Sequence, residues 1–172
     1  MRFLNKILVV LLVFSLFNSL AIAQTAEQNY KAGETKIRQG DYAGAIEEFS
    51  KAIAADPKML NAYLKRAFCY GLTDQYEKAI LDYSVTIDAQ PEVIFSYQSR
   101  GSAHLKLGHS DEALADFNKV LELDPKNQEA YNNRGFVKKS MGDMDGACKD
   151  WYKSKKMGND EAIIIIKNNR CR

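Results

Sequence analysis

Proline, histidine and cysteine are all scarce in this sequence, which has three, two and three of them in 172 residues. No pair of cysteines has the close spacing of a zinc-binding motif, and no nucleophile motif surrounds the histidines. A phosphate-binding glycine loop is also missing. These absences exclude the common metal, nucleophile and phosphate-loop sites, so the sequence predicts a protein that is not an enzyme and has no cofactor and no metal site.

Blocks of like charge are missing as well. The chain has 24 lysines and arginines and 22 acidic residues, a formal net charge of +2. Arg2 and Lys6 lie in a segment of 23 residues without an acidic residue, so the rest of the chain carries 22 charges of each sign. Nucleic acid attracts net basic surfaces. Nucleic acid is therefore not an expected partner.

Long apolar runs are limited to the N-terminus. The two basic residues there precede an apolar stretch over 7–17, and small residues follow at Ala21 and Ala23. This order predicts a secretory signal peptide over 1–23, cleaved before Gln24. An uncleaved membrane anchor is the alternative, although the apolar stretch is shorter than the roughly 20 residues that span a bilayer. We expect an exported protein of a bacterial periplasm, with secretion to the medium or membrane tethering as alternatives, and no membrane span after cleavage.

The three prolines, Pro57, Pro91 and Pro125, are spaced 34 residues apart, and the same step links three further columns. Those columns are small residues at Gly33, Ala67, Gly101 and Gly135, alanines at Ala45, Ala79, Ala113 and Ala147, and aromatic residues at Phe49, Tyr83, Phe117 and Trp151. This period and these residue types resemble the tetratricopeptide-repeat (TPR) family, whose repeat unit is helix A, a turn and helix B.

The resemblance implies an all-α fold, a TPR α-solenoid in which four helix-turn-helix repeats and a C-terminal capping helix form a right-handed superhelix. The expected repeats are TPR 1 over 26–59, TPR 2 over 60–93, TPR 3 over 94–127 and TPR 4 over 128–161, followed by the capping helix over 162–172. We expect the small residue at position 8 of helix A to face the alanine at position 20 of helix B, so that the two helices approach closely.

The turns and joints of the repeats have residues suited to them. Gly40, Gly108 and Gly142 can adopt the left-handed conformation that stops helix A. In the second repeat Asp74 stands near this place, and aspartate tolerates that conformation. Each proline lacks an amide donor and ends helix B a residue or two earlier.

A charged column departs from the family pattern. Arginine stands at position 7 of helix A in the last three repeats, and aspartate stands at position 23 of helix B in the same repeats. The pairs are Arg66 and Asp82, Arg100 and Asp116, and Arg134 and Asp150. Because the planar guanidinium can meet a carboxylate through two hydrogen bonds, we predict structural ion pairs within or between repeats. A solvated charged face is the alternative.

The resemblance also implies a concave groove lined by helices A that binds a peptide or protein. We call its residues the helix-A surface. Carried over by repeat position, they are Tyr30, Lys31, Glu34, Arg38, Asn61, Leu64, Lys65, Phe68, Leu72, Phe95, Gln98, Ser99, Ser102, Leu105, Lys106, Glu129, Asn132, Asn133, Phe136 and Lys139. An unused surface is the alternative. Some TPR domains clamp a chaperone's terminal carboxylate with lysine, asparagine and arginine at set repeat positions, where the first three repeats here have Tyr30, Glu34, Lys65, Phe95 and Ser99, which do not match.

The three cysteines and a run of isoleucines near the C-terminus complete the prediction. A disulfide between Cys148 and Cys171 would clip the cap helix, with two unpaired thiols as the alternative, while Cys69 is expected as a buried free thiol. Isoleucines 163–166 cannot all face one neighbour, so the cap is either well covered or presents an apolar strip to a partner or a second copy.

Two histidines, His104 and His109, are five residues apart across an expected helix end and are predicted to be poor metal ligands. The expected function is a non-enzymatic scaffold or adaptor of the cell envelope that binds an unidentified protein or peptide. The alternative is a structural subunit that self-associates or docks in an envelope assembly through its cap helix.

Overall fold

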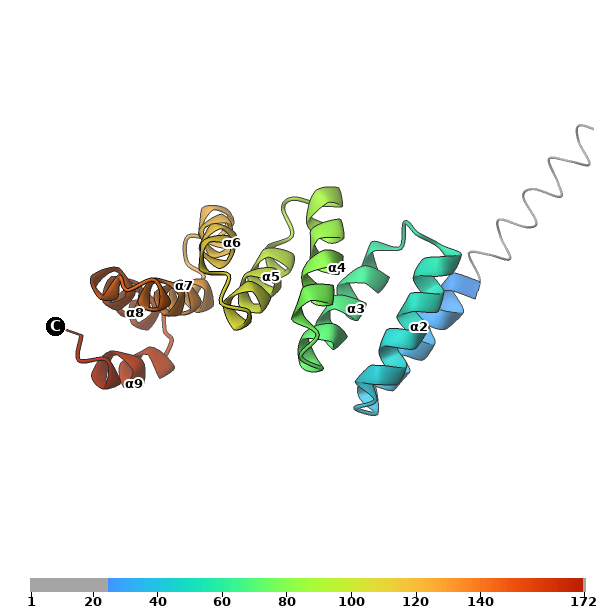
Figure 1. Cartoon of the computed structure of the whole chain (residues 1–172), viewed down its shortest axis with the longest axis horizontal. Coiled ribbons are helices and arrows are strands. Elements are labelled where there is room, and N and C mark those ends of the chain that lie inside the picture. The colour runs from blue at the N-terminus through green and yellow to red at the C-terminus, as the bar shows by residue number, and fades with distance from the viewer. Residues whose placement is uncertain (1–24, 172) are drawn as a thin grey trace, which may run out of the picture. The chain divides into compact units, whose positions relative to one another are not determined.

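The fold is all-α, as the repeat pattern predicts. In the computed structural model, residues 25–171 are described, and the predicted signal peptide over 1–23 lies outside them. Within this range every regular element is a helix (Figure 1). A helix over 25–38 is followed by α2 (Tyr42–Ala55), α3 (Leu60–Leu72), α4 (Tyr76–Ala89), α5 (Ile94–Lys106), α6 (Ser110–Leu123), α7 (Gln128–Ser140), α8 (Met144–Lys156) and α9 (Glu161–Asn168).

The chain divides into two compact units between Cys69 and Tyr70, inside α3. In the first unit, the ring of Phe49 on α2 is fully buried beside Ala45 and Ala52 of the same helix. Tyr30 packs against Phe49 from the helix over 25–38, with ring centres 5.6 Å apart. The first unit therefore has a small apolar core of its own.

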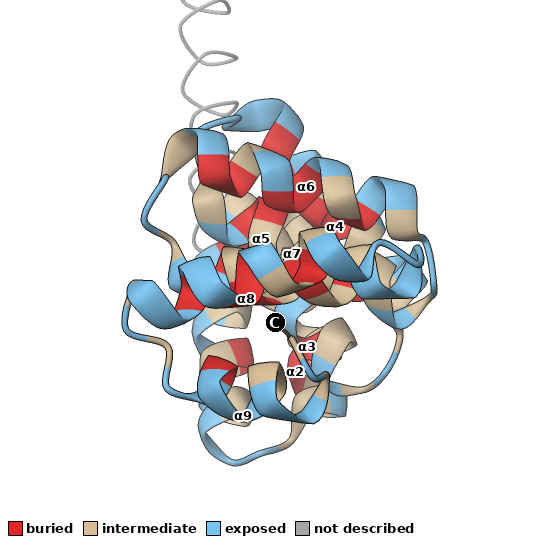
Figure 2. Cartoon of the chain, turned by 90° about the vertical axis from the view of Figure 1, so that its left-hand side faces the viewer, coloured by how far each residue is buried: buried red, intermediate tan, exposed pale blue. Residues whose placement is uncertain are grey.

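In the second unit, consecutive helices from α4 to α9 pack against one another, and α5 also touches α7. The buried residues of this unit gather where consecutive helices from α4 to α8 face each other (Figure 2). Phe117 and Val120 of α6 and Val137 of α7 are fully buried in this core. Helices A and B alternate as a helix-turn-helix solenoid requires.

The small column at position 8 has a different neighbour from the one expected. A Cβ added to Gly33 would lie 2.6 Å from the Phe49 ring, and one added to Gly135 would lie 2.5 Å from Nε1 of Trp151. At these two glycines the closest atoms thus belong to the aromatic residue at position 24, whereas at Gly101 Cβ of Asp116 at 3.1 Å comes just before the Phe117 ring at 3.2 Å. The aromatic ring fills the space over the glycine, which is why a side chain there is excluded.

The turns after helices A have the predicted conformation. Gly40, Gly108 and Gly142 have φ angles of 76°, 77° and 84°, and Asp74 has a φ of 56° in the second repeat. The left-handed conformation is thus kept in all four repeats, by aspartate where glycine is missing.

The joint between α8 and α9 is built like a turn within a repeat. Gly158 has a φ of 103°. Its N–H donates to the carbonyl of Lys155 at 3.0 Å, and the N–H of Asn159 donates to Ser154 at 3.2 Å. After helix A of the first repeat, the N–H of Gly40 bonds the carbonyl three residues back in the same way. A glycine therefore replaces the proline joint before the last helix.

Helix α9 begins at Glu161, one residue before the segment expected for the cap, and it is poorly covered. Ala162 is fully buried, whereas Ile163 and Ile164 are 47% and 63% exposed. Ile165 and Ile166 are half-buried. The expectation of a well-covered cap is wrong, because this eight-residue helix turns one side to α8 and leaves the opposite side in water.

Candidate functional site

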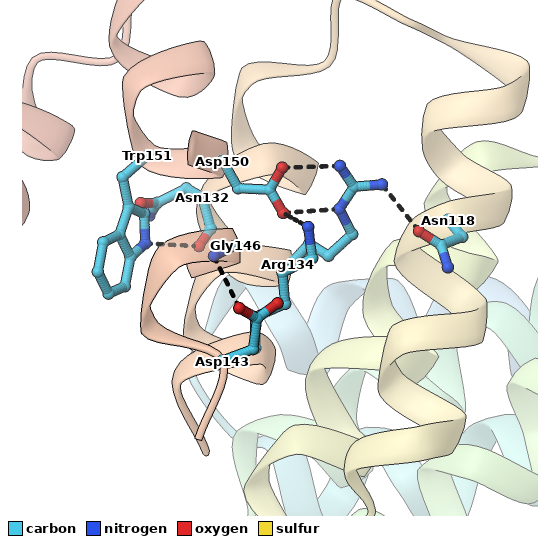
Figure 3. Close-up of polar contacts among 8 residues, drawn as sticks. Asn118, Asn132, Arg134, Asp143, Gly146, Asp150 and Trp151 are labelled. Carbon is cyan, nitrogen blue, oxygen red and sulfur yellow. Dashed lines mark hydrogen bonds and ion pairs between the residues drawn. The ribbon is translucent and has the colours of Figure 1, made fainter. Parts of the chain in front are cut away.

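The Arg134–Asp150 pair links helix A to helix B of the fourth repeat (Figure 3). Nε and Nη2 of Arg134 donate to the two carboxylate oxygens of Asp150 at 2.8 and 2.7 Å, and Nζ of Lys138 reaches the same carboxylate at 2.7 Å. Asp150 is 4% exposed. Its hydrogen bonds raise the pKa of Arg134. The third repeat repeats this fork, with Nε and Nη2 of Arg100 at 2.9 and 2.7 Å from Asp116.

Each arginine also reaches back to the preceding repeat through Nη1. Arg100 donates to Oγ of Ser84 at 2.9 Å, and Arg134 donates to Oδ1 of Asn118 at 2.8 Å. In the first unit Arg66 donates to Oγ of Ser50 at 3.0 Å. The arginine column therefore joins helices within a repeat and across the joint between repeats. The polar acceptors at position 25 of helix B were missed by sequence reasoning, although their 34-residue spacing is visible in the sequence.

A tyrosine at position 4 of helix A lies under each of these guanidinium groups. The guanidinium carbon lies 5.9 Å from the ring centre of Tyr97 in the third repeat and 5.5 Å from that of Tyr131 in the fourth. Cation–π contact adds to the fixed position of the arginine. Arg100 and Arg134 are each held by a carboxylate, a polar acceptor of the preceding repeat and an aromatic ring. The pairing of Arg66 with Asp82 would cross from the first unit to the second and stays a prediction.

In the first unit, the helix-A surface is a mixed strip of charged, amide and apolar side chains. Phe68 is 38% exposed and is the largest exposed apolar side chain of α3 in this unit. Burial and two neighbouring carboxylates raise the pKa of half-buried Tyr30, burial being the larger cause. The exposed members are Lys31, Arg38, Asn61 and Phe68, and the half-buried members are Tyr30, Glu34, Leu64 and Lys65.

In the second unit, the most exposed apolar members of the helix-A surface are Leu72 at 47% and Phe95 at 48%. Phe95 rests with one edge against Tyr83, at 6.3 Å between ring centres. Its other side is therefore open. Lys106 and Glu129 are also exposed, while Gln98, Ser99, Ser102, Leu105 and Asn133 are half-buried.

The fourth repeat contributes less to this surface than the sequence suggested. Asn132 is 7% exposed, its Oδ1 has no hydrogen-bond partner within residues 25–171, and its backbone carbonyl accepts from the Trp151 indole at 3.1 Å. Phe136 is half-buried with its ring centre 5.4 Å from that of Trp151. Nζ of Lys139 donates to Asn169, beyond α9, at 2.6 Å. The open apolar part of the helix-A surface therefore lies on α3 and α5.

The C-terminal clip is present in the structure. Cys148 and Cys171 form a disulfide with 5.5 Å between their Cα atoms. A pocket of about 320 Å³ opens beside it, lined in part by Met144, Tyr152 and Arg170. Cys69 is buried and outside any disulfide, and burial raises its pKa to about 11.

No cluster of three or more histidine, cysteine or acidic side chains in residues 25–171 is arranged to hold a metal ion. Among the helices described, none combines the length and apolar character needed to cross a bilayer. Phe68 in the first unit and Phe95 in the second each present an exposed aromatic ring, and Gln98 and Ser99 on the same helix as Phe95 carry amide and hydroxyl groups.

Two family models match the chain. One, described as TPR repeat, matches residues 101–142, and the other, described as tetratricopeptide repeat, matches residues 36–81. No match was found among curated proteins.

Solved structures of TPR proteins are similar over most of the chain. YrrB, described as a TPR protein with an unusual peptide-binding site, has a TM-score of 0.79 and 22% identity, over 83% of this chain and 74% of its own. A structure of MamA has a TM-score of 0.74 and 23% identity, over 80% of this chain and 81% of its own. MamA from Desulfovibrio magneticus RS-1, from residue 41 to its end, has a TM-score of 0.75 and 21% identity. The match covers 78% of this chain and 77% of its own. At these identities the likeness concerns the fold.

Proposed function

The chain is built from tetratricopeptide repeats with the all-α TPR fold, and we propose that it is a non-enzymatic adaptor that binds a peptide or protein segment along its helix-A surface. The observation that carries this proposal is the exposure of Phe68 on α3 and Phe95 on α5, at 38% and 48%. The other phenylalanines on described helices, Phe49, Phe117 and Phe136, are buried or half-buried.

An aromatic side chain that is exposed to water costs free energy, and burying it makes it an anchor of an interface. Leu72, 47% exposed at the end of α3, adds an apolar side chain to the same surface. Gln98 and Ser99 of α5 offer donors and acceptors beside Phe95, where a bound backbone needs hydrogen-bond partners. YrrB, which shares the fold, is described as having a peptide-binding site. Together these features favour an apolar peptide segment with an exposed backbone.

The test begins with capture of binding proteins from an envelope extract by the full chain, followed by measurement of Kd for the isolated partner. Phe68→Ala and Phe95→Ala should each weaken binding by about 2 kcal/mol, or roughly 30-fold in Kd, as for a central interface anchor. The matched control is Leu81→Ala, because Leu81 is 67% exposed on α4, a helix B. A partner whose Kd is raised by neither helix-A variant, or whose binding the control weakens equally, would contradict the proposal.

We further propose export to the periplasm through a signal peptide over 1–23. The order of basic, apolar and small residues supports this proposal, and so does the disulfide, since disulfides persist in oxidising compartments. N-terminal sequencing of the protein from a periplasmic fraction should begin at Gln24. A chain that begins at Met1, or that stays in the cytoplasmic fraction, would refute export with cleavage.

A second candidate function is that of a structural subunit that self-associates or docks through α9. The exposure of Ile163 and Ile164 favours it. Sedimentation over a range of concentrations should then show a dimer that Ile163→Ser and Ile164→Ser abolish while helix content is unchanged. A monomer at all concentrations, whose binding to an envelope partner these variants leave intact, would rule it out.

A further inference from the structure

His104 and His109 are brought together by the turn between α5 and α6. His104 lies near the end of α5, and His109 is the N-cap residue of α6. The N–H of His109 donates to the carbonyl of His104 at 2.9 Å, across the left-handed Gly108. The two Nδ1 atoms are 3.5 Å apart, with ring centres at 5.7 Å.

The turn itself produces this contact. In the first repeat the same two columns hold Lys36 and Asp41, joined by the same backbone bond at 3.0 Å. Their side chains form an ion pair, with Nζ 2.7 Å from Oδ2. The glycine turn therefore allows the side chains of these two columns to meet in the first and third repeats, whereas in the fourth Lys138 pairs with Asp150 instead. Sequence spacing alone, which predicted poor metal ligands, did not include this fold-back.

We propose that His104 and His109 chelate one divalent transition-metal ion through their two Nδ1 atoms. Metal–imidazole bonds are about 2.0–2.1 Å long, so two nitrogens on one tetrahedral ion lie about 3.4 Å apart. The 3.5 Å between the Nδ1 atoms matches that separation. Water completes the coordination, and both rings must be neutral with their protons on Nε2.

The surroundings suit a site of modest affinity. His109 is exposed, which gives an ion a path from solvent, and His104 is half-buried. The positive N-terminal end of α6 opposes a bound cation, whereas the exposed carboxylate of Glu112 in its first turn offsets that effect. Without metal, one Nδ1 can donate its proton to the other, and the ion has to displace this hydrogen bond.

Competing ligands within the chain are few. The sequence has two histidines, and both belong to this pair. Cys148 and Cys171 are bonded to each other, and Cys69 is buried with a raised pKa. Thiolate, the strongest alternative ligand, is therefore not offered by the folded protein.

The test is calorimetric titration of the full chain, prepared without a polyhistidine tag, with Cu²⁺ and with Zn²⁺. We expect about one ion per chain, with Cu²⁺ bound more tightly than Zn²⁺ as in the Irving–Williams order. Loss of an outer-shell partner typically costs about 10–100-fold in metal affinity, so His104→Asn and His109→Asn should each cost at least as much. In NMR spectra, both imidazoles should broaden together on substoichiometric Cu²⁺.

A transplant provides the matched test. Lys36→His combined with Asp41→His places two histidines on the turn of the first repeat. Because the turn has the same backbone bond there, the number of metal ions bound per chain should rise to about two. Circular dichroism checks that each variant is folded. Metal binding that survives both asparagine variants would show coordination elsewhere, and no Cu²⁺ binding by the parent chain would show that the pair is a plain hydrogen bond. Either result would overturn the proposal.

Discussion

Replacing the buried Asp150 by asparagine should destabilise the protein by several times the cost of losing an exposed charge of the same helix. The carboxylate is 4% exposed and accepts from Arg134 and Lys138. Removing one partner of a buried pair costs about 3–5 kcal/mol, because the other charge stays buried without compensation. The side chains of Arg134 and Lys138 keep 19% and 23% exposure, so water reaches both. We therefore expect a loss at the lower end, about 3 kcal/mol.

The assay is urea unfolding followed by circular dichroism. Asp145→Asn is the matched control, because Asp145 is exposed on the first turn of the same helix. It should cost about 0.5 kcal/mol through its interaction with the helix dipole. The double variant Arg134→Met/Asp150→Leu should be more stable than Asp150→Asn, since it removes both charges. If Asp150→Asn were no worse than the control, the pair would be a solvated contact and the reasoning would be refuted.

Three further predictions concern glycine and cysteine residues. Gly135→Ala should lower the free energy of unfolding by about 2 kcal/mol, since its Cβ would lie 2.5 Å from the Trp151 indole. Gly71→Ala, with no atom within 4 Å of its Cβ, should raise the free energy of unfolding by about 0.5–1 kcal/mol. Urea unfolding curves that rank the two variants the other way would contradict the packing of Trp151 over Gly135. Cys148→Ser with Cys171→Ser should lower the free energy of unfolding by about 3 kcal/mol, for a sequence separation of 23 residues. The double variant should also expose the amides of the last helix to hydrogen exchange. Unchanged protection of these amides would show that the disulfide is dispensable. Burial raises the pKa of the Cys69 thiol from 9.0 to about 11, so this thiol should resist alkylation at pH 8 until the chain unfolds. Its contribution to stability should hold below about pH 9 and be lost as the pH rises towards 11. Rapid labelling of the native chain would disprove burial.

The 34-residue period predicted the helices and their turns because both depend on local chemistry. Gly40 and Gly142 stop a helix by their left-handed backbone, and Asp74 does so in the one repeat that lacks glycine there. The Arg100–Asp116 and Arg134–Asp150 pairs could be predicted because two complementary columns have the same period.

Contacts that depend on the angle between helices could not be read from one column at a time. The position-8 glycines were assigned to an alanine neighbour, but the aromatic ring of the next turn extends over them. Burial of Asn132 depends on the packing of Trp151 against helix α7, and exposure of Ile164 depends on where the short last helix lies. The contact between His104 and His109 needs the fold-back of the turn, which residue spacing does not express.

The most direct test of the central claim is a map of amide chemical-shift changes when the captured partner segment is titrated into the ¹⁵N-labelled protein. If the helix-A surface binds it, the largest changes should fall on α3 and α5 around Phe68 and Phe95, with little change around Leu81 of α4. Changes gathered around Ile163 and Ile164 of α9, with α3 and α5 unperturbed, would contradict the adaptor function and support the structural subunit.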